Sequence, residues 1–149
     1  MSSIKIRQVN VADAESVAHL FNQYRQFYAQ TPDIALATQF MTERIAKQES
    51  VILVAESDGE IVGFCQMYPT FCSVEAAKIA VLYDLFVAQT ARKIGAGRAL
   101  MLAASDYAKQ HGYARLDLST AKTNVNAQAL YESLGWVRDA QFYYYSLDL

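Results

Sequence analysis

The sequence is poor in the residues that build metal sites and disulfide frameworks. It has two cysteines and two histidines among 149 residues. Cys65 and Cys72 are seven positions apart, a spacing that fits neither a CxxC pair nor a zinc site. His19 and His111 stand alone in the sequence, whereas a metal site needs several ligands. We therefore predict free thiols and no bound metal.

The sequence also lacks a basic excess and long apolar runs. Its formal net charge is −2, whereas nucleic-acid-binding domains usually carry a basic excess. No apolar run approaches the length that spans a bilayer, and no apolar segment of the signal-peptide type follows Met1. We therefore expect a cytoplasmic protein that binds neither nucleic acid nor a membrane.

Apolar periodicity dominates the first half of the sequence. The composition is 53% apolar, which suits a single domain over residues 1–149. The pattern predicts a strand over 4–9 and helices over 14–28 and 35–47. Asp58-Gly59 between two apolar runs predicts a β-hairpin. Pro69 should end the second strand of this hairpin or lie at a sheet edge.

The second half alternates between strands and helices. Strands are expected over 78–87, 115–119, 136–138 and 142–147, with helices after the first two. This order predicts an α/β fold, with a mixed, mostly antiparallel central sheet of about seven strands flanked by about four helices. It contains a β-α-β unit, in which strands 78–87 and 115–119 should be parallel.

A glycine-containing stretch lies at the start of the helix in this unit. Residues 91–100 read A-R-K-I-G-A-G-R-A-L. The first N–H groups of a helix have no partner within it, and glycine lets an anion approach the backbone. The stretch lacks the Lys-Ser/Thr pair of a Walker loop and the third glycine of a dinucleotide-binding loop. From these residues alone, a phosphate-binding loop and a plain turn both remain open.

A second polar stretch, T-N-V-N-A-Q-A-L-Y-E-S-L-G-W, covers residues 123–136. Tyr131 shares the apolar stripe of its helix with Ala127, Leu130 and Leu134. That position is typical of a core tyrosine, whose hydroxyl needs a partner when buried. A phenol that faces a cleft can instead donate a proton. Periodicity leaves both interpretations open.

Together the two stretches resemble the GCN5-related N-acetyltransferase (GNAT) superfamily. The family's pyrophosphate loop, R/Q-x-x-G-x-G/A, is matched by residues 92–97. Its later motif, N-x-x-A-x-x-L-Y-x-x-x-G-F/W, is matched from Asn124 to Trp136. The motifs lie about one β-α-β unit apart, as in the family, and the resemblance in element order covers almost the whole chain.

The resemblance implies acetyl-coenzyme A as the acetyl donor. Pantetheine would bind the exposed backbone of the strand before the loop, at Leu85, Phe86 and Val87. Asn124 would also contact the cofactor, and Tyr131 would protonate the departing thiolate. The pyrophosphate would be held by the loop residues Arg92, Lys93, Ile94, Gly95, Ala96, Gly97 and Arg98.

The general base is the least determined part of the predicted site. L-Y-D-L-F-V resembles the polyamine-acetylating branch of the family, in which an acidic pair often precedes F-F-V. Tyr83 stands at the first acidic position, which leaves Asp84 as the base or a substrate anchor. On a regular strand Tyr83 and Asp84 would face opposite sides. Glu75 and a water chain are the alternatives.

The acceptor is predicted from aromatic and acidic residues near the first two helices and the last strand. Tyr24, Tyr28, Asp33 and the tyrosines of 143–145 suit an amine through cation–π contacts, although core and dimer-interface roles stay open. We therefore predict an N-acetyltransferase that acetylates a primary amine of a small molecule, polyamine-like or amino-acid-like, by direct attack. The alternatives are a protein lysine or N-terminal acetyltransferase and a non-catalytic acyl-CoA-binding module. The resemblance also implies a homodimer.

Overall fold

The computed structural model describes residues 3–149, which form two compact units. The first unit ends at Ser119 and the second runs from Thr120 to Leu149. The first unit holds a five-stranded sheet in the order β1-β2-β3-β4-β5, antiparallel except for the parallel β4–β5 pair. Its strands are β1 Ile4–Gln8, β2 Val51–Ser57, β3 Glu60–Cys72, β4 Ala77–Val87 and β5 Leu116–Asp117.

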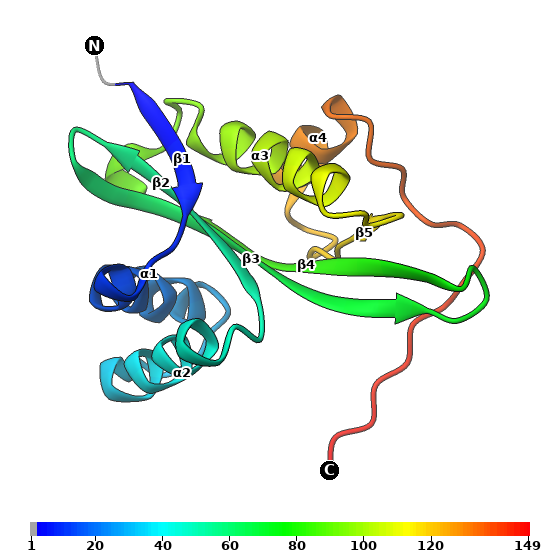
Figure 1. Cartoon of the computed structure of the whole chain (residues 1–149), viewed down its shortest axis with the longest axis horizontal. Helices are drawn as coiled ribbons and strands as arrows, with labels where there is room; N and C mark the ends of the chain where they lie inside the picture. The colour runs from blue at the N-terminus through cyan, green and yellow to red at the C-terminus, as the bar shows by residue number, and fades with distance from the viewer. Residues whose placement is uncertain (1–2) are drawn as a thin grey trace. The chain divides into compact units, whose positions relative to one another are not determined.

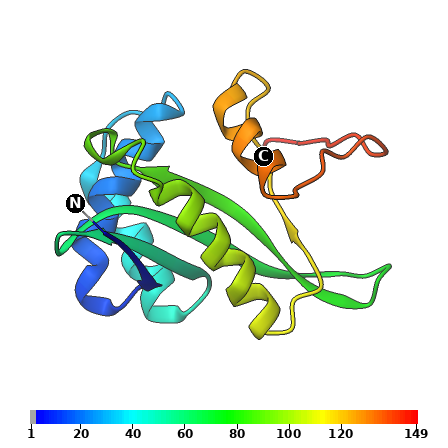
Figure 2. The same ribbon diagram turned by 90° about the horizontal axis from the view of Figure 1, so that it is seen from above.

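Helices cover both faces of this sheet (Figure 1). One face carries α1 (Ala14–Phe27), which follows the short 3-10 helix η1 (Val11–Asp13), and α2 (Ile34–Lys47). The opposite face carries α3 (Ala96–Gln110), which follows the 3-10 helix η2 (Gln89–Ala91). Figure 2 shows α3 running across the strands, with α1 and α2 behind them. The helices predicted in this unit are confirmed.

The predicted hairpin and its proline behave as expected. Asp58 and Gly59 have φ angles of 53° and 80°, and two positive φ values are typical of a type I′ turn. Strand β3 continues through Pro69, which pairs with Ala80 of β4. The pairing of β3 with β2 ends at Met67, so Pro69 lies in a part of β3 with one free edge.

The main core lies between the sheet and the first two helices. Ile52 and Val54 of β2 and Phe64 of β3 are buried against these helices. Their partners are the buried residues Val17, Leu20, Phe21, Ala37 and Met41. Because side chains alternate along a strand, the residues between them point to the opposite face, which α3 covers. This alternation determines which polar side chains lie under α1 and α2.

Gly63 lets the strands and α3 approach closely on that opposite face. A Cβ at this position would lie 3.0 Å from the carbonyl oxygen of Phe86 and 3.4 Å from Leu100 Cδ1. Leu100 is fully buried in α3. A side chain at Gly63 would therefore push against the backbone of β4, next to the predicted cofactor-binding strand end.

Strands β4 and β5 pair only briefly. They are parallel, as predicted, and their paired residues are Ala80 with Leu116 and Val81 with Asp117. The expected strand over 115–119 is thus limited to two residues. Beyond Val81, β4 continues for six residues to Val87 and pairs with β3. The strands therefore diverge toward the carboxyl end of β4.

The prediction of about seven strands is wrong. The described second unit contains one helix, α4 (Val125–Ser133), and residues 136–138 and 142–147 form no strand there. Tyr143, Tyr144 and Tyr145 are 87–91% exposed. The Asp139 carboxylate accepts hydrogen bonds from the backbone N–H groups of Gln141 and Phe142, which turns the chain. Alternation indicates strand propensity, but a strand also needs a partner for its backbone.

Candidate active site

A β-bulge in β4 determines where the predicted acid points. The register between β3 and β4 shifts between Gln66 and Met67, which leaves Tyr83 as an extra residue. Asp84 pairs with Gln66, and the ring of Tyr83 contacts that of Tyr68, with centroids 5.5 Å apart. Gln66 and Tyr68 are two residues apart on β3 and share a face. The expectation that Tyr83 and Asp84 face opposite sides is therefore wrong, because the bulge interrupts the alternation.

Asp84 lies buried on the face that α1 and α2 cover. It is 8% exposed, and Phe86, two residues further along β4, packs against the core under these helices. One carboxylate oxygen, Oδ2, accepts a hydrogen bond from Gln66 Nε2 at 2.8 Å. Gln66 has no exposed surface, and its Oε1 accepts a hydrogen bond from Ser50 Oγ at 2.7 Å. The carboxylate thus ends a chain of hydrogen bonds from Ser50.

Tyrosines from α1, β3 and β4 surround this carboxylate. The hydroxyl of Tyr24 donates to the carbonyl oxygen of Tyr83 at 3.1 Å. Tyr24 also contacts Tyr28 edge to face, with ring centroids 5.2 Å apart. Tyr68 and Tyr83 form the second edge-to-face pair. Two aromatic pairs therefore lie near Asp84, an arrangement that favours a cationic amine.

Burial controls the protonation of this group of side chains. Removal from water raises the pKa of Asp84, while hydrogen bonds from Gln66 and Tyr24 lower it by smaller amounts. Burial, followed by the charge of Asp84, raises the pKa of Tyr24 above its usual range. The same two causes raise the pKa of Tyr68 to about 12. Tyr24 and Tyr68 stay neutral, and Asp84 can take up a proton.

The diverging end of β4 exposes backbone groups beside Asp84. The backbone N–H of Ala88 donates to the carbonyl oxygen of Val62 in β3. Because backbone groups alternate in direction along a strand, those of Phe86 also point toward β3, and those of Leu85 and Val87 point toward the open edge. The Val87 carbonyl accepts a hydrogen bond from Arg92 Nε at 3.2 Å. Of the three residues predicted to contact pantetheine, Leu85 and Val87 thus present their backbones to the open edge. Phe86 instead packs its ring near Tyr24.

The glycine-containing stretch begins α3 as expected. Gly95 is the N-cap of this helix with φ of 87°, and Ala96 is its first residue. A Cβ placed on Gly95 would have no neighbour within 4 Å, so the space above the loop is open. The N–H of Ala99 makes the first hydrogen bond of the helix, to Gly95 O, which leaves the preceding helical N–H groups for an anion. Three exposed cations, Arg92, Lys93 and Arg98, accompany the loop.

The remaining predicted site residues lie in the second unit. Asn124 is the N-cap of α4, and its Oδ1 accepts a hydrogen bond from the N–H of Ala127 at 3.3 Å. Tyr131 is half-buried on α4, and its ring lies 6.2 Å from that of Trp136. The N–H of Trp136 donates to the carbonyl oxygen of Tyr131, which fixes the two residues at the helix end. The roles of Asn124 and Tyr131 stay predictions.

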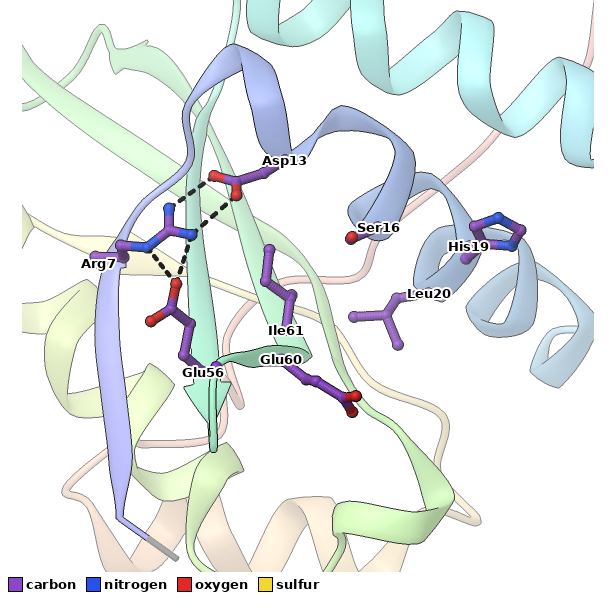
Figure 3. A pocket seen from close by; sticks show the side chains of 9 residues that line it. Arg7, Asp13, Ser16, His19, Leu20, Glu56, Glu60 and Ile61 are labelled. Carbon is purple, nitrogen blue, oxygen red and sulfur yellow. Dashed lines mark hydrogen bonds and ion pairs between the residues drawn. The ribbon is translucent and has the colours of Figure 1, made fainter.

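A second buried carboxylate belongs to a different kind of arrangement. Asp13 binds Arg7 through two hydrogen bonds of 2.7 and 2.9 Å, and Arg7 also binds Glu56 (Figure 3). These hydrogen bonds hold the pKa of Asp13 below its ordinary value. The groups line an open, polar pocket of about 480 Å³ that also includes His19 and Glu60. Because Arg7 is already paired with two acids, this pocket has the character of a structural ion-pair network.

Several other candidates have structural roles. Glu75 is ion-paired with Arg115 at 2.7 Å. Asp33 caps α2 by accepting a hydrogen bond from the N–H of Leu36. Burial raises the pKa of the Cys65 thiol to about 12, which makes it a poor nucleophile. Within the described part of the chain, no three His, Cys, Asp or Glu side chains gather as a metal ion would need. Among residues 3–149, no helix has the length and apolarity to cross a bilayer.

The sequence-based prediction missed Gln66 and Ser50. Gln66 lies in the apolar run I-V-G-F-C-Q-M-Y of β3, and a polar side chain on the buried face of a strand needs a partner. That is the signal that points to Gln66. Ser50 carries no comparable signal, because its partner is 16 residues away in the sequence.

Comparison with known sequences places these features in a family. Residues 14–136 match the sequence model of the Acetyltransferase (GNAT) family. The chain is 47% identical over 146 residues to the "uncharacterized N-acetyltransferase YhfO" of Bacillus subtilis (strain 168), covering 98% of each protein.

Comparison with solved structures agrees. A crystal structure of a probable acetyltransferase superposes with a TM-score of 0.91 at 33% identity, over 97% of each chain. An aminoglycoside N-acetyltransferase solved in complex with CoA shares the fold, with a TM-score of 0.82 at 18% identity over 100% of this chain and 97% of the other.

Proposed function

The chain belongs to the acetyltransferase (GNAT) family and is an N-acetyltransferase, and from this premise we propose that it transfers the acetyl group of acetyl-CoA to a primary amine of a small molecule. The observation that carries this proposal is Asp84, a buried carboxylate surrounded by tyrosines beside the open edge of β4. The family model spans most of the first unit and the start of the second. This span supports one acetyltransferase domain.

The cofactor contacts follow from the open backbone of the first unit. Members of the family use acetyl-CoA, which supplies the acetyl group as an activated thioester. The backbone of Leu85 and Val87 would bind the pantetheine arm, and the first N–H groups of α3 would bind the pyrophosphate. The open space at Gly95 fits this role, because no side chain blocks the approach of an anion. Asn124 is proposed as a further contact, by family resemblance.

The chain's own residues then divide the proton transfers. Asp84 accepts one proton from the ammonium form of the acceptor, and the resulting neutral nitrogen bonds to the carbonyl carbon. The N–H of Leu85 donates to the carbonyl oxygen as negative charge develops there. The carbon–sulfur bond breaks, and the Tyr131 phenol gives its proton to the sulfur. The nitrogen's second proton restores the phenol, and Asp84 releases the first proton to water.

The acceptor is proposed to be a small cationic amine rather than a polymer. The two edge-to-face tyrosine pairs near Asp84 offer ring faces to an ammonium group, which supports this choice. A panel of polyamines, amino acids and lysine peptides, assayed by release of the CoA thiol, tests it. Turnover of the peptides alone would favour the protein-acetylating alternative. Binding of acetyl-CoA by calorimetry without turnover of any amine would favour a non-catalytic module.

The Tyr131 role is tested separately. Tyr131→Phe should lower kcat about 100-fold, because it removes a general acid, and should leave acetyl-CoA affinity nearly unchanged. An unchanged kcat would remove Tyr131 from this role. The homodimer stays a prediction, which light scattering of the purified chain tests.

A further inference from the structure

Gln66 is a fully buried amide whose two ends are both occupied. Its Nε2 donates to Asp84 Oδ2 at 2.8 Å, and its Oε1 accepts from Ser50 Oγ at 2.7 Å. An amide can be turned end for end, but the ionised carboxylate of Asp84 only accepts hydrogen bonds and therefore selects the orientation in which the Gln66 N–H faces it. The hydroxyl of Ser50, which can donate or accept, donates to Oε1 in this orientation and holds the other end of the amide. The ionised carboxylate thus meets an N–H donor and not the amide oxygen.

The cost of burying Asp84 makes this donor important. A carboxylate removed from water tends to become protonated, and a protonated acid cannot accept a proton from an amine. The described residues around Asp84 that titrate are Tyr24 of α1, Cys65 and Tyr68 of β3, and Tyr83 beside it on β4. Arg44 and Glu49, which carry charge, act on Tyr68 from α2 and the segment after it.

We propose that Gln66, held at its far end by Ser50, is a positioning residue that keeps Asp84 ionised at neutral pH, so that Asp84 can act as the base in acetyl transfer. This inference rests on the proposed function for its catalytic part. The hydrogen-bond chain that carries it comes from the geometry of β3, β4 and the segment before β2. Gln66 touches neither substrate nor cofactor in this account and acts through Asp84.

The decisive variant is Gln66→Met, which keeps the length of the side chain and removes the donor. Carbon-13 NMR of the aspartate carboxyl groups measures the Asp84 titration directly, with its signal assigned by its loss in Asp84→Asn. We expect the Asp84 titration in Gln66→Met to move upward by about one pH unit, because a hydrogen bond to a charged group is lost. An unchanged midpoint would overturn the proposal.

The pH profile of kcat/KM tests the catalytic part. Its acidic limb should move upward in parallel with the NMR midpoint, whereas a purely structural role would lower activity equally at all pH values. If the midpoint moves and the limb does not, the catalytic part of the proposal is overturned. The NMR arm needs no acetylation, so it separates a failure of this inference from a failure of the proposed function.

Further variants guard against misfolding and test the role of Ser50. Ser50→Ala should move the midpoint in the same direction by a smaller amount, and Ser50→Thr, which keeps the hydroxyl, should restore it. Gln39→Met is the matched control, since Gln39 contacts Glu43 on the exposed side of α2. A shift in Gln39→Met equal to that in Gln66→Met would contradict the proposal. If Gln66→Met does not fold, Ser50→Ala decides: no shift there overturns the inference.

Discussion

Two aspartates of the first unit, Asp13 and Asp84, are each 8% exposed, yet their pKa values move in opposite directions. Asp13 meets the guanidinium of Arg7, whose positive charge and hydrogen bonds favour the ionised form. Asp84 meets a neutral amide and neutral phenols, which offset only part of the cost of removing its charge from water.

At Asp13 the hydrogen bonds from Arg7 outweigh the cost of burial, whereas at Asp84 burial has the larger effect, so the partner decides whether that cost is offset. An acid paired with a cation is held in one charge state and stabilises the fold. An acid whose partners are neutral donors has a pKa nearer to neutral pH, which suits a base. The four predictions below test this contrast, from the largest expected effect to the smallest.

The first prediction concerns activity. Asp84→Asn should lower kcat by about 100-fold to 10,000-fold, because it removes the group that accepts the ammonium proton. Asp13→Asn makes the same chemical change at an aspartate that is also 8% exposed and should keep kcat within about twofold of the unchanged protein. Thiol release under saturating amine and acetyl-CoA measures both. Equal losses of kcat in the two variants would contradict the distinction between Asp84 and Asp13.

The second prediction concerns stability, for which the order is reversed. Asp13→Ala should lower the free energy of unfolding by about 2 kcal/mol. The reason is that Arg7 loses a carboxylate that accepts two of its hydrogen bonds, and the N–H of Asn10 loses its acceptor. Asp84→Asn should leave this free energy unchanged or raise it, since a buried charge disappears while Gln66 keeps an acceptor. Urea denaturation at pH 7 measures both. A loss of stability in Asp84→Asn comparable with that in Asp13→Ala would contradict the assignment.

The third prediction concerns pH. The native pKa of Asp13 is lowered, so its stabilisation is present above the ordinary aspartate value of about 4 and is lost as pH falls through the native value. The native pKa of Asp84 is raised, so its ionisation costs stability as pH rises through the native value. The difference in free energy of unfolding between the unchanged protein and Asp13→Ala should therefore shrink as pH falls. The difference between the unchanged protein and Asp84→Asn should instead grow as pH rises. Denaturation midpoints from pH 3 to pH 8, about half a unit apart, reveal the two trends.

The fourth and smallest effect is expected at Tyr24. Tyr24→Phe keeps the ring packing and removes a hydroxyl that binds the Tyr83 carbonyl and lowers the pKa of Asp84. We expect kcat/KM to fall about fivefold, in line with the loss of one hydrogen bond. Tyr107→Phe, on α3, changes a tyrosine that stacks on His111 and should have no effect on kcat/KM. Equal behaviour of the two variants would exclude Tyr24 from the surroundings of the base.

The sequence predicted those parts of the fold that depend on local interactions. The Asp58-Gly59 turn and the helices of the first unit follow from residues close together in the chain, and the structure confirms them. The strands predicted over 136–138 and 142–147 failed because strand formation depends on a partner that local pattern does not supply. The pattern around the C-terminal tyrosines indicated strand propensity but did not indicate a partner strand.

The candidate site likewise has residues that the sequence predicted and contacts that it did not. Asp84 was predicted from the resemblance of its segment, L-Y-D-L-F-V, to the polyamine-acetylating branch of the family. Its contacts with Gln66, 18 residues away, and with Tyr24, from α1, depend on the register of β3 and β4 and on how α1 packs. The bulge that sets this register left no signature that the sequence analysis recognised.

That bulge also makes the pairing of β4 a functional property. Tyr83 is the extra residue, and the bulge absorbs it so that Asp84 lies opposite Gln66. If β4 instead paired regularly through Tyr83, every residue from Asp84 to Val87 would exchange faces and edges. The acid would then lie on the side of α3, and the amide of Phe86 rather than that of Leu85 would face the open edge. Because deletion of Tyr83 would leave Asp84 opposite Gln66, active descendants of this chain are expected to conserve that pairing rather than the number of residues between Ala80 and Val87.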